Sequence, residues 1–144
     1  MFTDDYYMKM ALQQAQLAFE KDEVPVGAII TFKDRVIAKA FNLTETLNDV
    51  TAHAEMQAIT AAANTLGGKY LNQCTLYVTL EPCLMCAGGA AWAQMGKIVF
   101  GAYDTKKGYS RIKEDILHPK TEVIGGIMEK ECGQIMKDFF SKKR

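Results

Sequence analysis

The alternation of apolar and polar residues along this chain predicts an α/β fold. Near the N-terminus, apolar side chains recur every three or four residues, which is typical of an amphipathic helix, here expected over residues 4–20. Two apolar runs, residues 26–32 and 36–41, follow and are rich in β-branched side chains. Because only three polar residues separate them, they predict an antiparallel hairpin. After a polar loop, helical spacing returns over residues 54–66 and predicts a second helix.

The next apolar run predicts the centre of a sheet. Residues 74–80 contain few polar side chains, so we expect this strand to be covered on both faces. A third helix is predicted from Pro82 to about Gly96, and residues 97–101 form the strand that follows. A strand, a helix and a second strand in this order imply a right-handed parallel crossover.

The last elements complete a three-layer α/β/α fold. A short strand near residues 122–125 and a helix over about residues 128–141 are expected. Together the pattern predicts a mixed five-stranded sheet with helices on both faces. No internal repeat, low-complexity tract or Ser/Pro-rich linker divides the sequence, so residues 1–144 are expected to form one domain.

Composition narrows the class of protein. The chain has 144 residues, of which 49% are hydrophobic and 24% charged, a balance typical of globular proteins that excludes a mainly disordered chain. Its apolar runs are shorter than the roughly 18 residues that a membrane span requires. The first residues lack the basic and then apolar pattern of a secretory signal. We therefore expect a cytoplasmic protein that does not insert into a membrane.

Charge is distributed unevenly, although the formal net charge is zero. Residues 1–96 hold six basic and ten acidic residues, a net charge of −4, whereas residues 97–144 hold eleven basic and seven acidic residues, a net charge of +4. The basic part can meet phosphate groups through counterion release, or it can be a solvated surface with a basic tail. Composition alone leaves both interpretations open.

Two short motifs supply candidate metal ligands. His53 lies at the expected start of one helix, and Cys83 and Cys86 lie at the start of another. One imidazole and two thiolates suit a tetrahedral ion such as zinc, and three protein ligands leave a fourth position for water, the pattern of a catalytic site. Cys74 or Cys132 would complete a structural site only if the fold brought one of them close. Cys83 and Cys86 could instead form a redox pair, but that hypothesis gives His53 no role.

Glu55 is the candidate proton shuttle beside that ion. His53 and Glu55 are two residues apart, so they cannot share one side of a helix, but both side chains can reach an ion beyond the helix end. Zinc lowers the pKa of bound water toward about 7, and a carboxylate that does not ligate can take the proton and hand it on. The other histidine, His118, stands beside Pro119 and far in sequence from the cysteines, which favours a structural role.

The spacing of these residues resembles a known signature. His53-Ala54-Glu55 followed by Pro82-Cys83-x-x-Cys86 is similar to the motif of zinc-dependent nucleobase deaminases. Over nearly its full length the sequence resembles bacterial tRNA-specific adenosine deaminases, and the similar segments include Glu23–Ala28, Thr79–Ala87 and Phe100–Asp104. The resemblance implies a cytidine-deaminase-like fold, a homodimer, and conversion of the wobble adenosine in the tRNA anticodon loop to inosine.

The resemblance also assigns roles to individual residues. It implies one zinc ion per subunit, held by the imidazole and the two thiolates, with Glu55 as the proton shuttle. It further implies that Asn42 binds the target base and that Asp104 contacts the substrate. The chain departs from this family at Tyr103, where arginine is usual, and in the loop over residues 43–50, which is acidic and contains no arginine.

Two alternative functions use the same motif. A deaminase of a free base, such as guanine, cytosine or a related ring, would share the metal chemistry but enclose its substrate, and Ala91-Trp92-Ala93 resembles guanine deaminases. A non-catalytic RNA-binding module would use zinc only to join two helices and would need a fourth ligand from the protein.

Four aromatic residues bear on nucleic-acid binding. Tyr103 and Tyr109 lie in a segment rich in lysine and are candidates for stacking on splayed bases. Phe139 continues an apolar series in the last predicted helix, so core packing is expected for at least one of Phe139 and Phe140.

Overall fold

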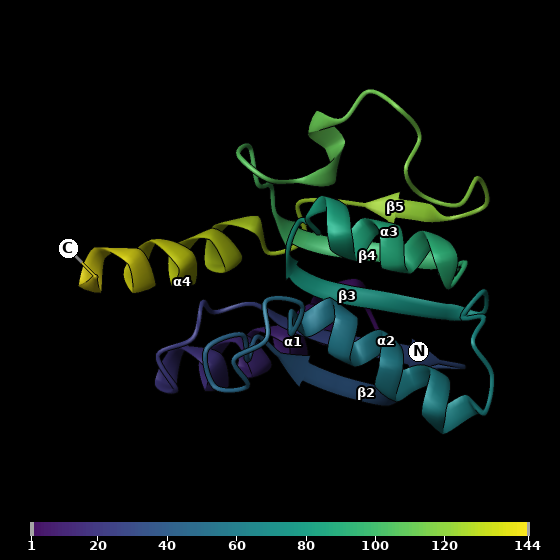
Figure 1. Ribbon diagram of the computed structural model, residues 1–144, viewed down its shortest axis with the longest axis horizontal. Coiled ribbons are helices and arrows are strands. Elements are labelled where there is room, and N and C mark those ends of the chain that lie inside the picture. The colour runs from purple at the N-terminus through teal and green to yellow at the C-terminus, as the bar shows by residue number, and fades with distance from the viewer. Residues whose placement is uncertain (1, 144) are drawn as a thin grey trace.

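The structure of the protein is a computed structural model that describes residues 2–143. Its strands form one mixed sheet in the order β2-β1-β3-β4-β5, with helices on both sides (Figure 1). The strands are β1 (Gly27–Phe32), β2 (Arg35–Phe41), β3 (Cys74–Leu80), β4 (Lys97–Ala102) and β5 (Glu122–Ile124). The helices are α1 (Asp4–Glu20), α2 (Ala54–Leu66), α3 (Leu84–Trp92), α4 (Glu129–Lys142) and the short 3-10 helix η1 (Tyr109–Arg111).

The sheet combines antiparallel and parallel pairing. β1 pairs antiparallel with β2 and β3, whereas β3 with β4 and β4 with β5 are parallel. Phe32 pairs with Arg35, so the hairpin turn contains two residues instead of the three that the sequence suggested. These residues, Lys33 and Asp34, have φ values of +51° and +61°, the conformation that matches the right-handed twist of paired strands. The parallel pairing of β3 and β4 across α3 confirms the predicted parallel connection.

Two apolar layers hold the helices to the sheet. On one face, α2 and α3 pack over side chains such as Ile30 and Leu76. On the other face, α1 and α4 pack over Ile29 and Tyr77, the neighbours of those residues in β1 and β3. Successive strand residues therefore enter opposite cores, as expected for a sheet covered on both sides. The predicted three-layer α/β/α fold is confirmed, and within residues 2–143 no helix is long and apolar enough to cross a membrane.

The third helix is shorter than predicted. It covers residues 84–92 instead of about 82–96. At its start, Cys83 is extended and serves as the N-cap. At its end, Gln94 has a φ of +56°, and the N–H of the next residue donates five positions back, the pattern of a Schellman motif. Glycine is the usual residue at such a position, so a glutamine there carried no sequence signal for the helix end.

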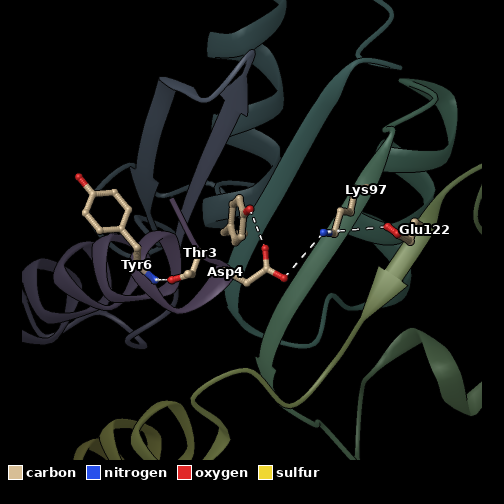
Figure 2. A network of polar contacts seen from close by, with 6 residues as sticks. Thr3, Asp4, Tyr6, Lys97 and Glu122 are labelled. Carbon is tan, nitrogen blue, oxygen red and sulfur yellow. Dashed lines mark hydrogen bonds and ion pairs between the residues drawn. The ribbon is translucent and has the colours of Figure 1, made fainter. Parts of the chain in front are cut away.

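A polar network fixes the start of α1 to the sheet (Figure 2). The Oγ1 of Thr3 accepts a backbone hydrogen bond within the first turn of the helix. Asp4 accepts a hydrogen bond from the Tyr77 hydroxyl at 2.9 Å, and its carboxylate lies 3.7 Å from Lys97 Nζ. Lys97 and Glu122 are the first residues of β4 and β5, and Lys97 Nζ lies 4.0 Å from Glu122 Oε1. The two ion pairs of Lys97 lie where β4 and β5 begin, whereas Tyr77 joins the network from the middle of β3.

Close packing between α1 and β1 generates a stability prediction. A Cβ at Gly27 would overlap the α1 backbone at Ala11 and Ala15. Gly27→Ala must push the helix away from the sheet, so we expect it to lower the free energy of unfolding by about 1–3 kcal/mol. Gly68→Ala is the matched control, because a Cβ there meets nothing within 4 Å, and its effect should stay within about 0.5 kcal/mol. Denaturant unfolding of both variants checks the difference, and equal stabilities would contradict it.

Candidate active site

The metal-ligand candidates come from the N-termini of two neighbouring helices. α2 follows the loop after β2, and His53 is its N-cap. α3 follows the end of the central strand β3, where Cys83 is the N-cap and Cys86 lies in the first turn. Functional groups of α/β proteins gather at this carboxyl edge of the parallel strands. Because α2 and α3 pack side by side on one face of the sheet, their N-termini converge there (Figure 1).

His53, Cys83 and Cys86 form one cluster. Their ligand atoms all lie within 4.8 Å of one another, with Cys83 Sγ 3.6 Å and Cys86 Sγ 3.4 Å from His53 Nδ1. One imidazole and two sulfurs are the donor set of a borderline-soft divalent ion, and three ligands leave a tetrahedral ion one further position. Cys74 and Cys132 lie outside the cluster, so within residues 2–143 no fourth cysteine completes it.

The cysteines and the histidine influence one another's protonation. Hydrogen bonds from Cys86 and then from His53 lower the pKa of the Cys83 thiol to about 4. The interaction with Cys83 raises the pKa of Cys86, and burial raises it further. The pKa of His53 is also raised, chiefly by its hydrogen bond with Cys83. A thiolate is therefore present at neutral pH beside the N-terminal ends of two helices, and this favours binding of a cation.

Glu55 lies in the first turn of α2, beside the cluster. Only 4% of its surface is exposed, and burial is the main cause that raises the pKa of its carboxyl group to about 7. The charge of Cys83 acts in the same direction. A carboxyl group with a pKa near neutrality can both accept and donate a proton, which is the property required of a general acid and base.

A pocket of about 410 Å³ opens in front of the cluster and Glu55. It is framed by four further parts of the chain: the segment before β1, the turn after β2, the turn after β4, and α4. The lining residues from these parts are Val24, Val26, Asn42, Thr44, Asp104, Lys107, Met136 and Phe140. The pocket therefore has the size and the mixed apolar and polar lining that suit a small ring-shaped ligand.

Asn42 and Asp104, the two residues that the resemblance assigned to substrate, both line this pocket, Asn42 after the end of β2 and Asp104 after the end of β4. Asn42 is 6% exposed, and its side-chain amide donates to the Val24 carbonyl at 3.3 Å and accepts from the Thr44 N–H at 3.4 Å. The Oδ1 of Asp104 accepts two backbone hydrogen bonds at 3.0 Å from the residues that follow it. Each side chain thus uses some of its hydrogen bonds to stabilise the backbone of the turn on which it lies.

The aromatic residues divide between core and pocket. Phe139 is buried against α1, which confirms the expectation of core packing, whereas Phe140 lines the pocket. Neither Tyr103 nor Tyr109 is among the described residues that line the pocket, and Tyr103 packs edge-on against Phe100. Their stacking on bases stays a prediction.

Sequence reasoning did not assign Lys107 or Met136 to the site. Lys107 follows Asp104 within one turn, and Met136 precedes Phe140 by four residues on one face of α4. The i, i+4 spacing was the available signal for Met136, but it does not distinguish a pocket wall from a core.

Comparison with known proteins extends these findings. Residues 2–144 match the MafB19-like deaminase family. A tRNA-specific adenosine deaminase of Bacillus subtilis (strain 168) is 44% identical over 149 residues, which cover 100% of this chain and 92% of that protein. A structure from a study of A-to-I editing by tRNA:A34 deaminases at the wobble position of transfer RNA has a TM-score of 0.85 and 41% identity, over 90% of this chain and 98% of the other.

A guanine deaminase of Bacillus subtilis is also similar, with a TM-score of 0.69 and 35% identity over 72% of this chain and 67% of that one. The match to the tRNA-specific enzymes is more extensive in both directions, since it covers nine tenths or more of each chain. The sequence, the fold and the cluster of His53, Cys83 and Cys86 thus agree with one another. The chain belongs to the MafB19-like deaminase family and to the tRNA-specific adenosine deaminases.

Proposed function

We propose that this chain is a zinc enzyme that converts adenosine to inosine at the wobble position of tRNA. The observation that carries the proposal is the convergence of His53, Cys83 and Cys86 beside the buried carboxyl group of Glu55, at the floor of a pocket of base size. The names of the full-length relatives supply the substrate class. The proposal takes residues 1–144 as one catalytic domain that works as a homodimer in the cytoplasm, where its substrate is present.

The donor set fits one zinc ion per subunit. The imidazole of His53 and the thiolates of Cys83 and Cys86 would hold the ion, and when bound it would lower the pKa of a water molecule beside it toward about 7. The lowered pKa of Cys83 means that one ligand is already deprotonated at neutral pH. Cys86 is buried, so its sulfur is shielded from solvent and from oxidants.

Glu55 moves the proton in the proposed reaction. Its carboxylate takes a proton from the attacking water and gives it to N1 of the adenine ring as the water oxygen bonds to C6. Glu55 then takes the remaining proton of the hydroxyl group on C6 and gives it to the exocyclic nitrogen. The C6=O bond forms as the bond between C6 and that nitrogen breaks, and the nitrogen leaves as ammonia. Adenosine and water become inosine and ammonia, and Glu55 ends the cycle in its starting protonation state.

The pocket walls suit a base that has left the anticodon stack. Asn42 offers its amide to the edge of the ring, and Val24 and Val26 offer apolar contact. Asp104 contacts the substrate from the opposite turn, and the ammonium group of Lys107 at the same wall suits a phosphate of the RNA backbone. When a nucleotide is extruded from a loop, its base enters the pocket and its sugar-phosphate backbone stays at the surface.

Deamination of free guanine is the second candidate, because the guanine deaminase of Bacillus subtilis shares the fold and 35% identity. The two candidate substrates would use the same metal site, but only the tRNA substrate carries phosphate groups that the protein must also contact. A free base needs no cation for a phosphate, so the position of Lys107 favours the nucleic-acid substrate. A non-catalytic module would need a fourth protein ligand, and the described cluster contains three.

Sequencing of tRNA tests the proposed reaction directly. After incubation of tRNA with the protein, the wobble adenosine should be read as guanosine, because inosine pairs with cytidine. Ammonia release from guanine, cytosine and adenine is measured in parallel. Turnover of a free base without any change in tRNA would replace the proposal with the second candidate.

Glu55→Gln tests the proton shuttle. The amide keeps the size of the side chain but cannot accept the proton, so kcat on tRNA should fall by about 10² to 10⁴ or more. Zinc content, measured by elemental analysis, should stay at one ion per chain, because Glu55 is not assigned as a ligand. Wild-type turnover in the variant would remove Glu55 from the mechanism.

Cys83→Ser tests the ligand set. The variant replaces a thiolate with a poorer ligand, so zinc content and thermal stability should fall together. Cys132→Ala is the control, because this buried thiol lies outside the cluster and the variant should keep its zinc. A full complement of zinc in Cys83→Ser would exclude Cys83 as a ligand.

A further inference from the structure

Two buried carboxylates outside the metal cluster hold the turns that line the pocket. The first is Glu23, which is 1% exposed. Its Oε1 accepts a hydrogen bond from the Glu45 N–H at 3.1 Å. Its Oε2 accepts from the Thr46 N–H and from the Thr46 hydroxyl, both at 2.6 Å. All three donors belong to the turn after β2, the same turn that carries Asn42 and Thr44 into the pocket.

Glu81 makes the corresponding contacts on the other side of the pocket. It is 3% exposed, and its two carboxylate oxygens accept hydrogen bonds from the N–H groups of Asp104 and Ser110, each at 3.0 Å. A Cβ at Gly108 would overlap this carboxylate, so the turn lies flat against Glu81. The turn over residues 104–110 thus closes around one buried side chain.

Among residues 2–143, neither carboxylate forms an ion pair. A buried anion without a cation depends on N–H and O–H donors aimed at its oxygens. For Glu23, burial would raise the pKa, but the hydrogen bonds from residues 44–46 outweigh it and lower the pKa. The ionised state of Glu23 and the shape of the turn that it holds therefore depend on each other.

The two carboxylates act on different parts of the pocket wall, because their turns follow β2 and β4, which β1 and β3 separate in the sheet. The turn held by Glu23 brings Asn42 and Thr44 to the pocket, and the turn held by Glu81 brings Asp104 and Lys107. We propose that Glu23 and Glu81 are positioning residues for the substrate, each of which fixes one wall of the pocket through the backbone of a turn. This inference rests on the proposed function for its substrate, although the contacts themselves do not.

Glu23→Gln is the first test. The amide keeps the size of the side chain but turns an NH₂ group toward at least one of the N–H or O–H donors. The turn should then occupy its binding-competent shape less often, so KM for tRNA should rise about tenfold while kcat changes less than about twofold. Backbone amides of residues 44–46 should exchange hydrogen faster with solvent. Asp22→Asn is the control, because this neighbouring carboxylate is exposed and should leave all three quantities unchanged.

Variants of Thr46 separate positioning from general stability. Thr46 is exposed, so its substitution does not disturb a core. Thr46→Val removes the hydroxyl donor at constant shape and should raise KM severalfold, with kcat and zinc content unchanged. Thr46→Ser restores the donor and should restore KM. Equal KM values in Thr46→Val and Thr46→Ser would count against the role of Glu23.

Glu81→Gln is the parallel test on the second wall. KM should rise as in Glu23→Gln, and faster amide exchange should appear at residues 104 and 110 instead of residues 44–46. Zinc content reports whether the nearby cluster is intact, and thermal melting reports whether the variant is folded. A variant that is folded, retains zinc and exchanges at the wild-type rate overturns the proposal for that residue.

A merely structural role predicts a different outcome. In that case both variants would lose thermal stability and kcat together, with KM and the local exchange rates unchanged, and the proposal would be wrong. If the wild-type protein leaves tRNA unmodified, the proposed function fails on its own. The exchange rates of the two turns then still decide whether Glu23 and Glu81 hold them.

Discussion

The site depends on one constraint, the meeting of the α2 and α3 N-termini at the carboxyl edge of the central strands. His53 and Cys83 are both N-caps, so the backbone fixes where their side chains start and only short side chains are needed to reach a common point. Packing of both helices on the same face of the sheet holds the two N-termini together. Neither helix could shift by a turn, about 5.4 Å, without separating the ligands.

Much of the fold and the cluster could be predicted from local pattern, because the signals lie within a few residues. Helical spacing predicted α1 over roughly residues 4–20 and the end of α2 at Gly67, as the structure has them, and the lack of polar residues located β3 at the centre of the sheet. The early end of α3 was missed because a glutamine adopts the conformation usually taken by glycine. Glu23 and Glu81 could not be assigned, since their donors lie more than 20 residues away in sequence.

The region around the pocket contains several buried acidic groups. Glu23, Glu55 and Glu81 are all buried there, beside two cysteines of the cluster. These groups are stabilised in different ways. N–H donors of turns surround the carboxylates of Glu23 and Glu81, helix N-termini lie beside the Cys83 thiolate, and the raised pKa of Glu55 lets it hold a proton. Lys107, whose side chain is exposed, also lines this pocket and places a positive charge beside these acidic groups.

The ion pairs of Lys97 with Asp4 and Glu122 lie where β4 and β5 begin (Figure 2). β4 runs from Lys97 at that end to Ala102 at the other, a length of about 17 Å for six residues. Groups separated by more than about 10 Å with no shared partner contribute independently to the free energy. One end of the parallel strands therefore stabilises the fold, and the other end carries the candidate active site. Substitutions at the stabilising end can change the free energy of unfolding without changing catalysis.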